Sequence, residues 1–201
     1  MNLEALDAAI VRMHNFGAAY IENLLTAELC DQLLAEVDMT RRRKPRAEFA
    51  LPTEPDWVVD YPNHDYGPVL SDFICEFGQA IRTNRAEGRS GSADCLEDWY
   101  PNEAVFQGYP DGGGITDHRD FSNCRDLIVI INVRGQCRIR VKRYSPDWVG
   151  KGNWAMHTGD VVLLRGAGFQ RVSFYGRPQH GIYDCSGSRV SLCLRMLQPA
   201  A

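Results

Sequence analysis

One short segment, I-T-D-H-R-D, places a histidine and an aspartate two positions apart, at His118 and Asp120. On a strand or at its end, side chains at this spacing project from the same face, so imidazole and carboxylate would lie together. Two histidines and one carboxylate form a ligand set that binds Fe(II) on one side and leaves positions open for a cosubstrate and oxygen. An H-x-D pair alone is also compatible with a simple surface contact, so the metal hypothesis needs a third ligand.

Two of the five histidines are candidates for that third ligand. His180 lies in Q-H-G-I and His157 in A-M-H-T-G-D, and each stands just before a segment with the pattern of a strand. Each also has an arginine downstream, Arg189 for His180 and Arg165 for His157. We favour His180, because Arg189 begins a strand with an unusual polar face, and we expect His157 to be a turn residue.

That strand is R-V-S-L-C-L-R-M, residues 189–196. Its period of two puts two arginines and two small residues on one face and apolar side chains on the other. The polar face holds Arg189, Ser191, Cys193 and Arg195, without a carboxylate. In a dry interior two guanidinium groups need an anion, and a dicarboxylate suits them because guanidinium binds carboxylate in a bidentate fork. Two alternatives stay open: the arginines could pair with acids from neighbouring strands, or the face could be exposed.

Several segments resemble, in order, the motifs of AlkB-like Fe(II)/2-oxoglutarate dioxygenases. Q-G-Y-P-D-G-G-G-I-T-D-H-R-D (107–120) is similar to the family's N-x-Y, glycine turn and H-x-D, and its tyrosine has the same spacing from the histidine. G-D-V-V (159–162) resembles a family strand start, H-G-I (180–182) the distal histidine, and R-V-S-L-C-L-R (189–195) the family's R-x-N-x-T-x-R. The resemblance covers about residues 104–196, and the order and spacing of the short motifs are its specific part.

The resemblance implies a double-stranded β-helix, or jelly-roll, with helices packed on one side. It implies that His118, Asp120 and His180 bind iron, and that Arg189, helped by Tyr109, holds the far carboxylate of 2-oxoglutarate. With Fe(II), 2-oxoglutarate and O2, the enzyme would convert the cosubstrate to succinate and hydroxylate a substrate C–H bond. If that carbon is bound to nitrogen, the product would release formaldehyde. The other residues placed near the cosubstrate are Gln107, Ser191 and Arg195.

Some positions depart from the family pattern. Gln107 replaces the usual asparagine, and Ser191 and Cys193 replace asparagine and threonine in the arginine strand. Ser122 stands where DNA-repair members carry an acidic residue that helps to recognise a base amino group. The missing acid argues against a repair substrate.

Two segments of the first hundred residues bear on the substrate. The basic run T-R-R-R-K-P-R (40–46) could contact phosphates, although such runs are usually solvated loops. Trp57, Tyr61, His64 and Tyr66 could form a lid that stacks on a planar substrate, although we expect at least two of them, Trp57 in particular, to pack in the core.

Two substrate classes therefore compete, and we place the first ahead of the second. One is a modified nucleobase, in nucleic acid or as a nucleotide, from which a methyl group would be removed oxidatively; the resemblance favours this class. The other is a small metabolite that is hydroxylated at carbon; Ser122 and the net charge of −4 favour it. A jelly-roll binding module without catalytic activity is a third hypothesis.

The elements that must position these residues divide the chain near residue 100. Helical spacing of apolar residues predicts helices at 3–13 and about 69–85, and one capped by Thr26 that continues to Val37. Strand patterns follow at 104–109, 126–133, 137–144, 160–165, 171–175 and 189–196, with a short hairpin at 134–136. The sequence therefore predicts an α+β, mainly β domain spanning 1–201, with a helical flank and substrate lid at 1–100 and a jelly-roll core at 101–201.

Composition sets the wider limits. The chain has 201 residues, of which 44% are hydrophobic and 24% charged, as in one ordinary globular domain. Seven scattered cysteines without a C-x-x-C pair favour a reducing cytoplasm over a disulfide framework. The N-terminus does not resemble a signal peptide, and the apolar run 127–133 is too short to span a membrane. We expect a cytoplasmic monomer without a membrane partner.

Overall fold

The computed structural model describes residues 1–45, 55–62, 65–83, 96–142, 152–169 and 176–198. The three predicted helices are present as α1 (Leu3–Phe16), α2 (Ala27–Ala35) and α3 (Pro68–Thr83), with a 3-10 turn η1 at Met39–Arg41. The cap prediction is confirmed: the Thr26 hydroxyl accepts a hydrogen bond from the backbone N–H of Leu29 at the start of α2. None of the helices in the described part is long and apolar enough to cross a membrane.

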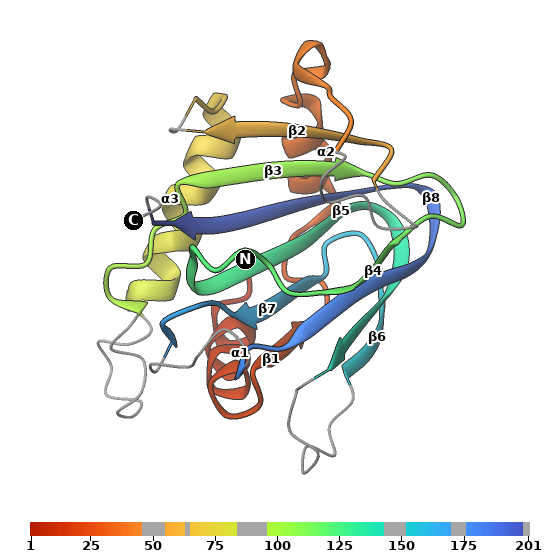
Figure 1. Ribbon diagram of the computed structural model, residues 1–201. Helices are drawn as coiled ribbons and strands as arrows, with labels where there is room; N and C mark the ends of the chain where they lie inside the picture. Colours follow the sequence, from red (N-terminus) through yellow and green to blue (C-terminus); the bar gives the residue numbers. More distant parts are fainter. Residues whose placement is uncertain (46–54, 63–64, 84–95, 143–151, 170–175, 199–201) are drawn as a thin grey trace.

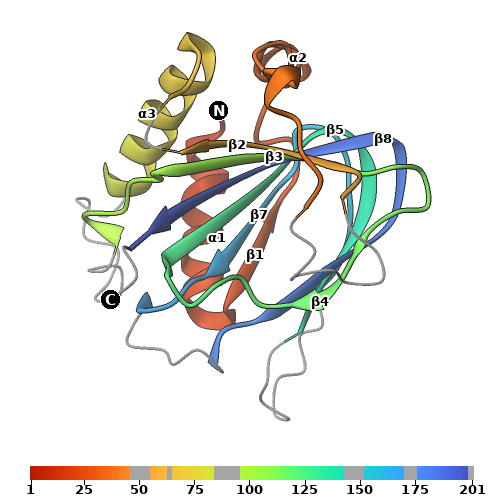
Figure 2. The same ribbon diagram turned by 45° about the horizontal axis from the view of Figure 1, so that its top comes forward.

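The strands form one antiparallel system in the order β1-β7-β5-β8-β3-β2, with β6 added to β5 and β4 to β8. Their bounds are β1 Ala18–Ile21, β2 Trp57–Pro62, β3 Glu103–Gly108, β4 Ile115–His118, β5 Cys124–Lys142, β6 Gly152–Met156, β7 Val161–Arg165 and β8 Gln179–Leu197. The two long strands β5 and β8 run side by side and curve, as Figures 1 and 2 show. One half of each strand belongs to one of two facing walls, and the other half belongs to the opposite wall.

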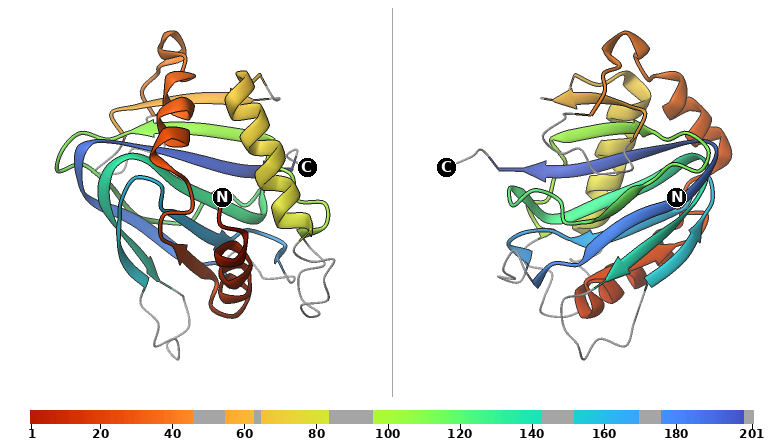
Figure 3. Two further views of the ribbon diagram at one scale, coloured as in Figure 1. Left: turned by 180° about the vertical axis from the view of Figure 1, so that it is seen from behind. Right: turned by 45° about the vertical axis from the view of Figure 1, so that its right-hand side comes forward.

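These two walls confirm the predicted jelly-roll. One wall contains β1, β7, β3 and β2, and the other contains β4 and β6. Helices cover the outer face of the larger wall, where α3 and α2 cross its strands in the view from behind (Figure 3). One apolar cluster lies between the helices and this wall, and a second lies between the walls. The site described below is built on the inner face, beside that second cluster.

The hairpin expected at 134–136 is wrong, because β5 continues through it. Gly135 has φ 72° and lies opposite Gly187 (φ 70°) and Ser188 (φ 49°) in β8, where the pairing of the two strands is irregular. A Cβ at Gly135 would lie 2.5 Å from the carbonyl oxygen of Ser186. The glycine therefore permits a close approach at a bend in two continuous strands, and the same freedom of φ makes the sequence look like a turn.

The first hundred residues are more than a helical flank. They contribute β1, which pairs with β7, and β2, which pairs with β3. Both strands are short, and A-A-Y-I offers little alternation from which a strand could be predicted. The strand predicted at 171–175 lies outside the described residues. The six cysteines in the described ranges are all free thiols, as expected.

Candidate metal and cosubstrate site

Three predicted ligands come together at the ends of β4 and β8. His118 and His180 are paired opposite each other in the ladder, with ring centroids 4.4 Å apart. Asp120 follows β4, and its Oδ2 lies 3.6 Å from His180 Nε2. His118 Nδ1 donates to the carbonyl of Thr116 at 2.8 Å, so Nε2 is the ring nitrogen available to a metal. His157 is instead exposed just before the turn that leads into β7, close to the turn position expected for it.

The chemistry of this donor set fits Fe(II). Burial lowers the pKa of His180 to about 3, so its imidazole is neutral and can bind a metal. Burial acts to raise the pKa of Asp120, but the positive charges of Arg195 and Arg177 act against it, and that pKa is held below its usual value. Asp120 Oδ2 is buried and has no hydrogen-bond partner among the residues that the structure describes. In the described ranges, no three His, Cys, Asp or Glu side chains lie close enough together to coordinate one metal ion. Metal binding would therefore require side-chain movements.

The burial of His180 makes stability depend on pH. The unfolded chain takes up a proton near the ordinary pKa of 6.5, whereas folded His180 stays neutral down to about pH 3. Stability from this group is therefore complete above pH 6.5 and is lost as the pH falls towards 3. We expect the metal-free protein to lose about 2 kcal/mol between pH 7 and pH 5, measured by urea unfolding in chelator. His180→Gln should flatten this slope; an unchanged slope would show that another group is responsible.

Arg177 joins the two segments that carry the ligands. Its side chain is buried, and its guanidinium donates to the backbone carbonyls of Asp120 and Phe121, each at 3.0 Å. In return, Arg119 Nε donates to the carbonyl of Arg177 at 3.1 Å. The turn after β4 and the start of β8 are thus linked by three hydrogen bonds. Sequence reasoning missed Arg177, because only its position three residues before His180 marks it.

We expect Arg177→Met to weaken Mn(II) binding about tenfold or more, because the backbone that carries Asp120 loses two charge-assisted bonds. Titration calorimetry with Mn(II) measures this effect, and circular dichroism checks that the variant is folded. Arg119→Met is the matched control, since it removes the bond in the opposite direction, to the carbonyl of Arg177, leaves both bonds to the Asp120 segment in place, and should have the smaller effect. A folded Arg177→Met protein with wild-type Mn(II) affinity would contradict this role.

All the residues that we predicted at the iron or the cosubstrate line one cavity. Its wall includes Gln107, Tyr109, His118, Asp120, His180, Arg189, Ser191 and Arg195, together with isoleucine side chains. The alternation predicted for residues 189–196 is confirmed: Val190, Leu192 and Leu194 lie in the cluster beneath the helices, on the opposite face of β8. The polar face is buried and not solvated, which removes the alternative of an exposed strand.

Arg189 has no acidic partner in the described ranges. Its side chain is fully buried, its Nε donates to Asn132 Oδ1 at 2.8 Å, and its Cζ lies 4.8 Å from the centre of the Tyr109 ring. Its two terminal nitrogens, Nη1 and Nη2, have no hydrogen-bond partner there. A buried cation with two parallel donors left open is suited to a carboxylate.

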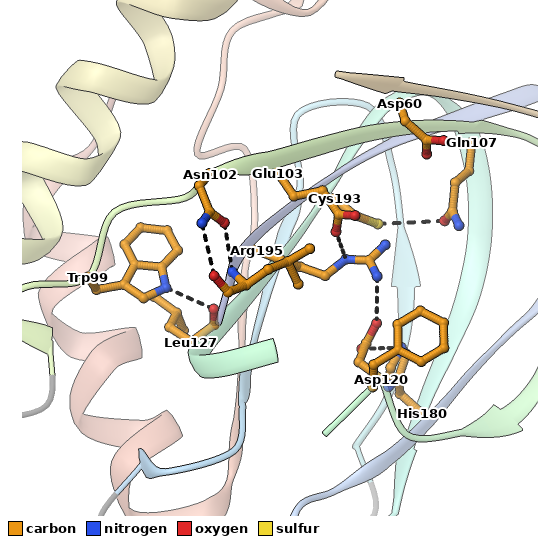
Figure 4. A network of polar contacts seen from close by, with 12 residues as sticks. Asp60, Trp99, Asn102, Glu103, Gln107, Asp120, Leu127, His180, Cys193 and Arg195 are labelled. Carbon is orange, nitrogen blue, oxygen red and sulfur yellow. Dashed lines mark hydrogen bonds and ion pairs between the residues drawn. The ribbon is translucent and has the colours of Figure 1, made fainter. Parts of the chain in front are cut away.

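Arg195 differs, because acids from other segments pair with it (Figure 4). Its Nε lies 3.3 Å from Oε2 of Glu103, the residue directly opposite in β3, and its Nη1 lies 3.4 Å from Asp120 Oδ1. The alternative of partners from neighbouring strands therefore holds for Arg195. Sequence reasoning missed Glu103, because the pairing of β3 with β8 is not visible in the sequence.

The predicted substrate lid is largely absent from the described structure. Tyr61 lies in the core, where its hydroxyl accepts from Asp38 N and donates to the carbonyl of Glu36, so its place in a lid is wrong. Trp57 packs partly buried over Gly108, where an added Cβ would meet its ring, in line with the expected core packing. His64 lies outside the described residues. Ser122 is exposed in the turn after Asp120.

Three arginines of the basic run are paired with acids. Arg41, Arg42 and Arg43 form ion pairs with Asp65, Asp56 and Asp60, respectively. These partners come from later segments, so the sequence showed the arginines as an unbroken positive run. Paired arginines are less available to phosphates, and this weakens the expectation of a nucleic-acid contact here.

Comparison with known proteins supports the fold through solved structures alone. No family model matches the chain, and no curated protein matches it. A Pseudomonas putida prolyl-4-hydroxylase superposes with a TM-score of 0.70 at 16% identity, covering 96% of this chain and 99% of that one. A viral collagen prolyl hydroxylase of Paramecium bursaria Chlorella virus-1, described as a 2OG complex, superposes with a TM-score of 0.63 at 11% identity, covering 89% of this chain and 94% of that one. OsALKBH1 superposes with a TM-score of 0.55 at 11% identity, covering 90% of this chain and 98% of that one. The chain thus shares the double-stranded β-helix fold of these proteins.

Proposed function

We propose that this protein is an Fe(II)- and 2-oxoglutarate-dependent dioxygenase that hydroxylates a substrate C–H bond. One observation carries the proposal: the fully buried guanidinium of Arg189 has two nitrogens without a hydrogen-bond partner among the described residues, and Arg189 lines the cavity that His118, Asp120 and His180 also line. A cation buried in this way needs an anion. The metal ligands and Arg189 could both be satisfied by a 2-oxo acid with a second carboxylate. Such a molecule can bind the metal with its 2-oxo acid end and Arg189 with its far carboxylate.

Each residue then has a defined role. His118, Asp120 and His180 hold the metal, and Arg189 binds the far carboxylate while Tyr109 supports the face of its guanidinium. Iron, when bound with O2, supplies the oxidative decarboxylation of the cosubstrate and the oxidation of the C–H bond. Ile128 and Ile130 line the same cavity and help to exclude water from it.

Arg195 acts on the metal side of this arrangement. Glu103 and Asp120 both pair with its guanidinium, so its charge is already balanced by the protein. We assign it to the orientation of Asp120. The cosubstrate is bound by Arg189, which has no such acids.

For the substrate, we place a small metabolite ahead of a nucleobase in nucleic acid. The arginines at 41–43 are paired with acids, and Ser122 lacks the carboxylate with which a base amino group would be recognised. Oxidative demethylation of a nucleobase or nucleotide is the second candidate, because the order of the motifs at 107–120, 180–182 and 189–195 resembles that of the AlkB-like enzymes.

A formaldehyde assay separates these two classes. The protein is incubated with Fe(II), 2-oxoglutarate and methylated oligonucleotides or nucleotides, and succinate and formaldehyde are both measured. We expect succinate without stoichiometric formaldehyde. Formaldehyde that matches succinate for one methylated base would establish the demethylase instead.

A further inference from the structure

We infer that Asn132 is a positioning residue that orients Arg189 towards the far carboxylate of a 2-oxo acid; this inference rests on the proposed function. Asn132 lies on β5, directly opposite Ser191 of β8, and its side chain is fully buried. Its side-chain oxygen accepts the hydrogen bond that Arg189 Nε donates.

Both halves of the Asn132 amide are used. Oδ1 accepts from Arg189 Nε at 2.8 Å, and Nδ2 donates to the carbonyl of Gly135 at 2.7 Å. Arginine nitrogens only donate, and a carbonyl only accepts, so these partners fix which way the amide points. The backbone is held as well: Asn132 N donates to the carbonyl of Asp160, and Gly159 N donates to the carbonyl of Asn132. The amide therefore has one orientation on a fixed strand.

The Gly135 contact links the arginine to the bend in β5 and β8. Gly135 approaches β8 so closely that a Cβ there would lie 2.9 Å from Arg189 Cα. Asn132 spans this bend, because it binds the Gly135 carbonyl with one group and the Arg189 side chain with the other. The guanidinium thus has its Nε bonded to Asn132 and its Cζ over the Tyr109 ring, whereas Nη1 and Nη2 have no hydrogen-bond partner in the part of the chain that the structure describes.

The neutrality of the amide matters for an incoming anion. Arg195, on the same face of β8, is neutralised by two acids, whereas Arg189 is held by an uncharged acceptor. An uncharged acceptor fixes the guanidinium and leaves its positive charge for the ligand. An aspartate at position 132 would pair with Arg189 directly and would also lose the donor to Gly135. The structure thus favours asparagine here by charge and by hydrogen-bonding capacity.

The test compares two 2-oxo acids that differ only at the far end. With saturating Mn(II) and without O2, calorimetry measures the binding of 2-oxoglutarate and of 2-oxovalerate, which lacks the second carboxylate. We expect Asn132→Asp to weaken 2-oxoglutarate binding about tenfold or more and to leave the affinities for 2-oxovalerate and Mn(II) unchanged. Wild-type affinity for 2-oxoglutarate, or an equal loss for both acids, would overturn the inference.

Two further variants keep the result interpretable. Thr158→Val removes the other side-chain donor to the Gly135 carbonyl, at 3.4 Å, without touching Arg189, and should bind 2-oxoglutarate like the wild type. An equal loss in Thr158→Val would assign the effect to the bend and not to the arginine. If Asn132→Asp does not fold, Asn132→Ser is the substitute, since serine is too short to bridge both partners. Wild-type protein that binds neither Mn(II) nor 2-oxoglutarate would reject the proposed function, whereas an unaffected Asn132 variant rejects this inference alone.

Discussion

Replacing Arg189 with methionine is expected to raise the 2-oxoglutarate concentration needed for half-maximal succinate formation on the order of a hundredfold. The physical reason is the loss of a cavity-lining buried cation whose two terminal nitrogens have no hydrogen-bond partner among the described residues. Mn(II) binding should change little, because none of the three proposed metal ligands pairs with Arg189 in the described structure. Initial rates of succinate formation over a range of 2-oxoglutarate concentrations give the half-maximal concentration. Calorimetry gives the affinity for Mn(II).

Two comparisons make this result specific. Arg189→Lys keeps a positive charge but cannot form the bidentate fork, so its effect should be intermediate. Arg195→Met should instead weaken Mn(II) binding, because Arg195 pairs with Asp120. An Arg189→Met protein that loses metal and cosubstrate affinity to the same extent would mean that Arg189 has only a structural role.

His118→Ala is expected to abolish succinate formation. Only Asp120 and His180 would remain of the proposed ligand set, and two ligands do not provide the facial site that leaves room for cosubstrate and oxygen. Succinate is measured by chromatography after incubation with Fe(II) and 2-oxoglutarate in air.

His157→Ala is the matched control for this substitution. His157 is exposed and does not line the cavity, so turnover should match the wild type. Full activity in His118→Ala, or equal loss in both variants, would show that the H-x-D segment does not bind the metal.

The sequence was informative where a pattern is local. The period of two in 189–196 correctly predicted which side chains of β8 face the cavity, since alternation follows from strand geometry alone. The Thr26 cap was likewise correct, because capping depends on a few adjacent residues. His118 and Asp120 were candidates because of their spacing and His180 because it precedes the strand that Arg189 begins, and the structure brings the three together.

What could not be predicted depends on contacts between distant segments. Asn132 and Glu103 contact the arginines of β8 from neighbouring strands, and no spacing in the sequence encodes those registers. Arg177 reaches backbone carbonyls, which carry no sequence signature. Tyr61 lies in the core because its strand, β2, pairs with β3. The short, turn-rich sequence around Tyr61 did not indicate that β2 is a strand.

The most direct test of the central claim is succinate formation by the purified protein with Fe(II), 2-oxoglutarate and air, without any added substrate. We predict slow, uncoupled succinate formation that requires all three and that 2-oxovalerate does not inhibit strongly, because it lacks the carboxylate that Arg189 would bind. Absence of succinate, together with absence of binding of both Mn(II) and 2-oxoglutarate, would contradict the account and leave a jelly-roll module without this chemistry.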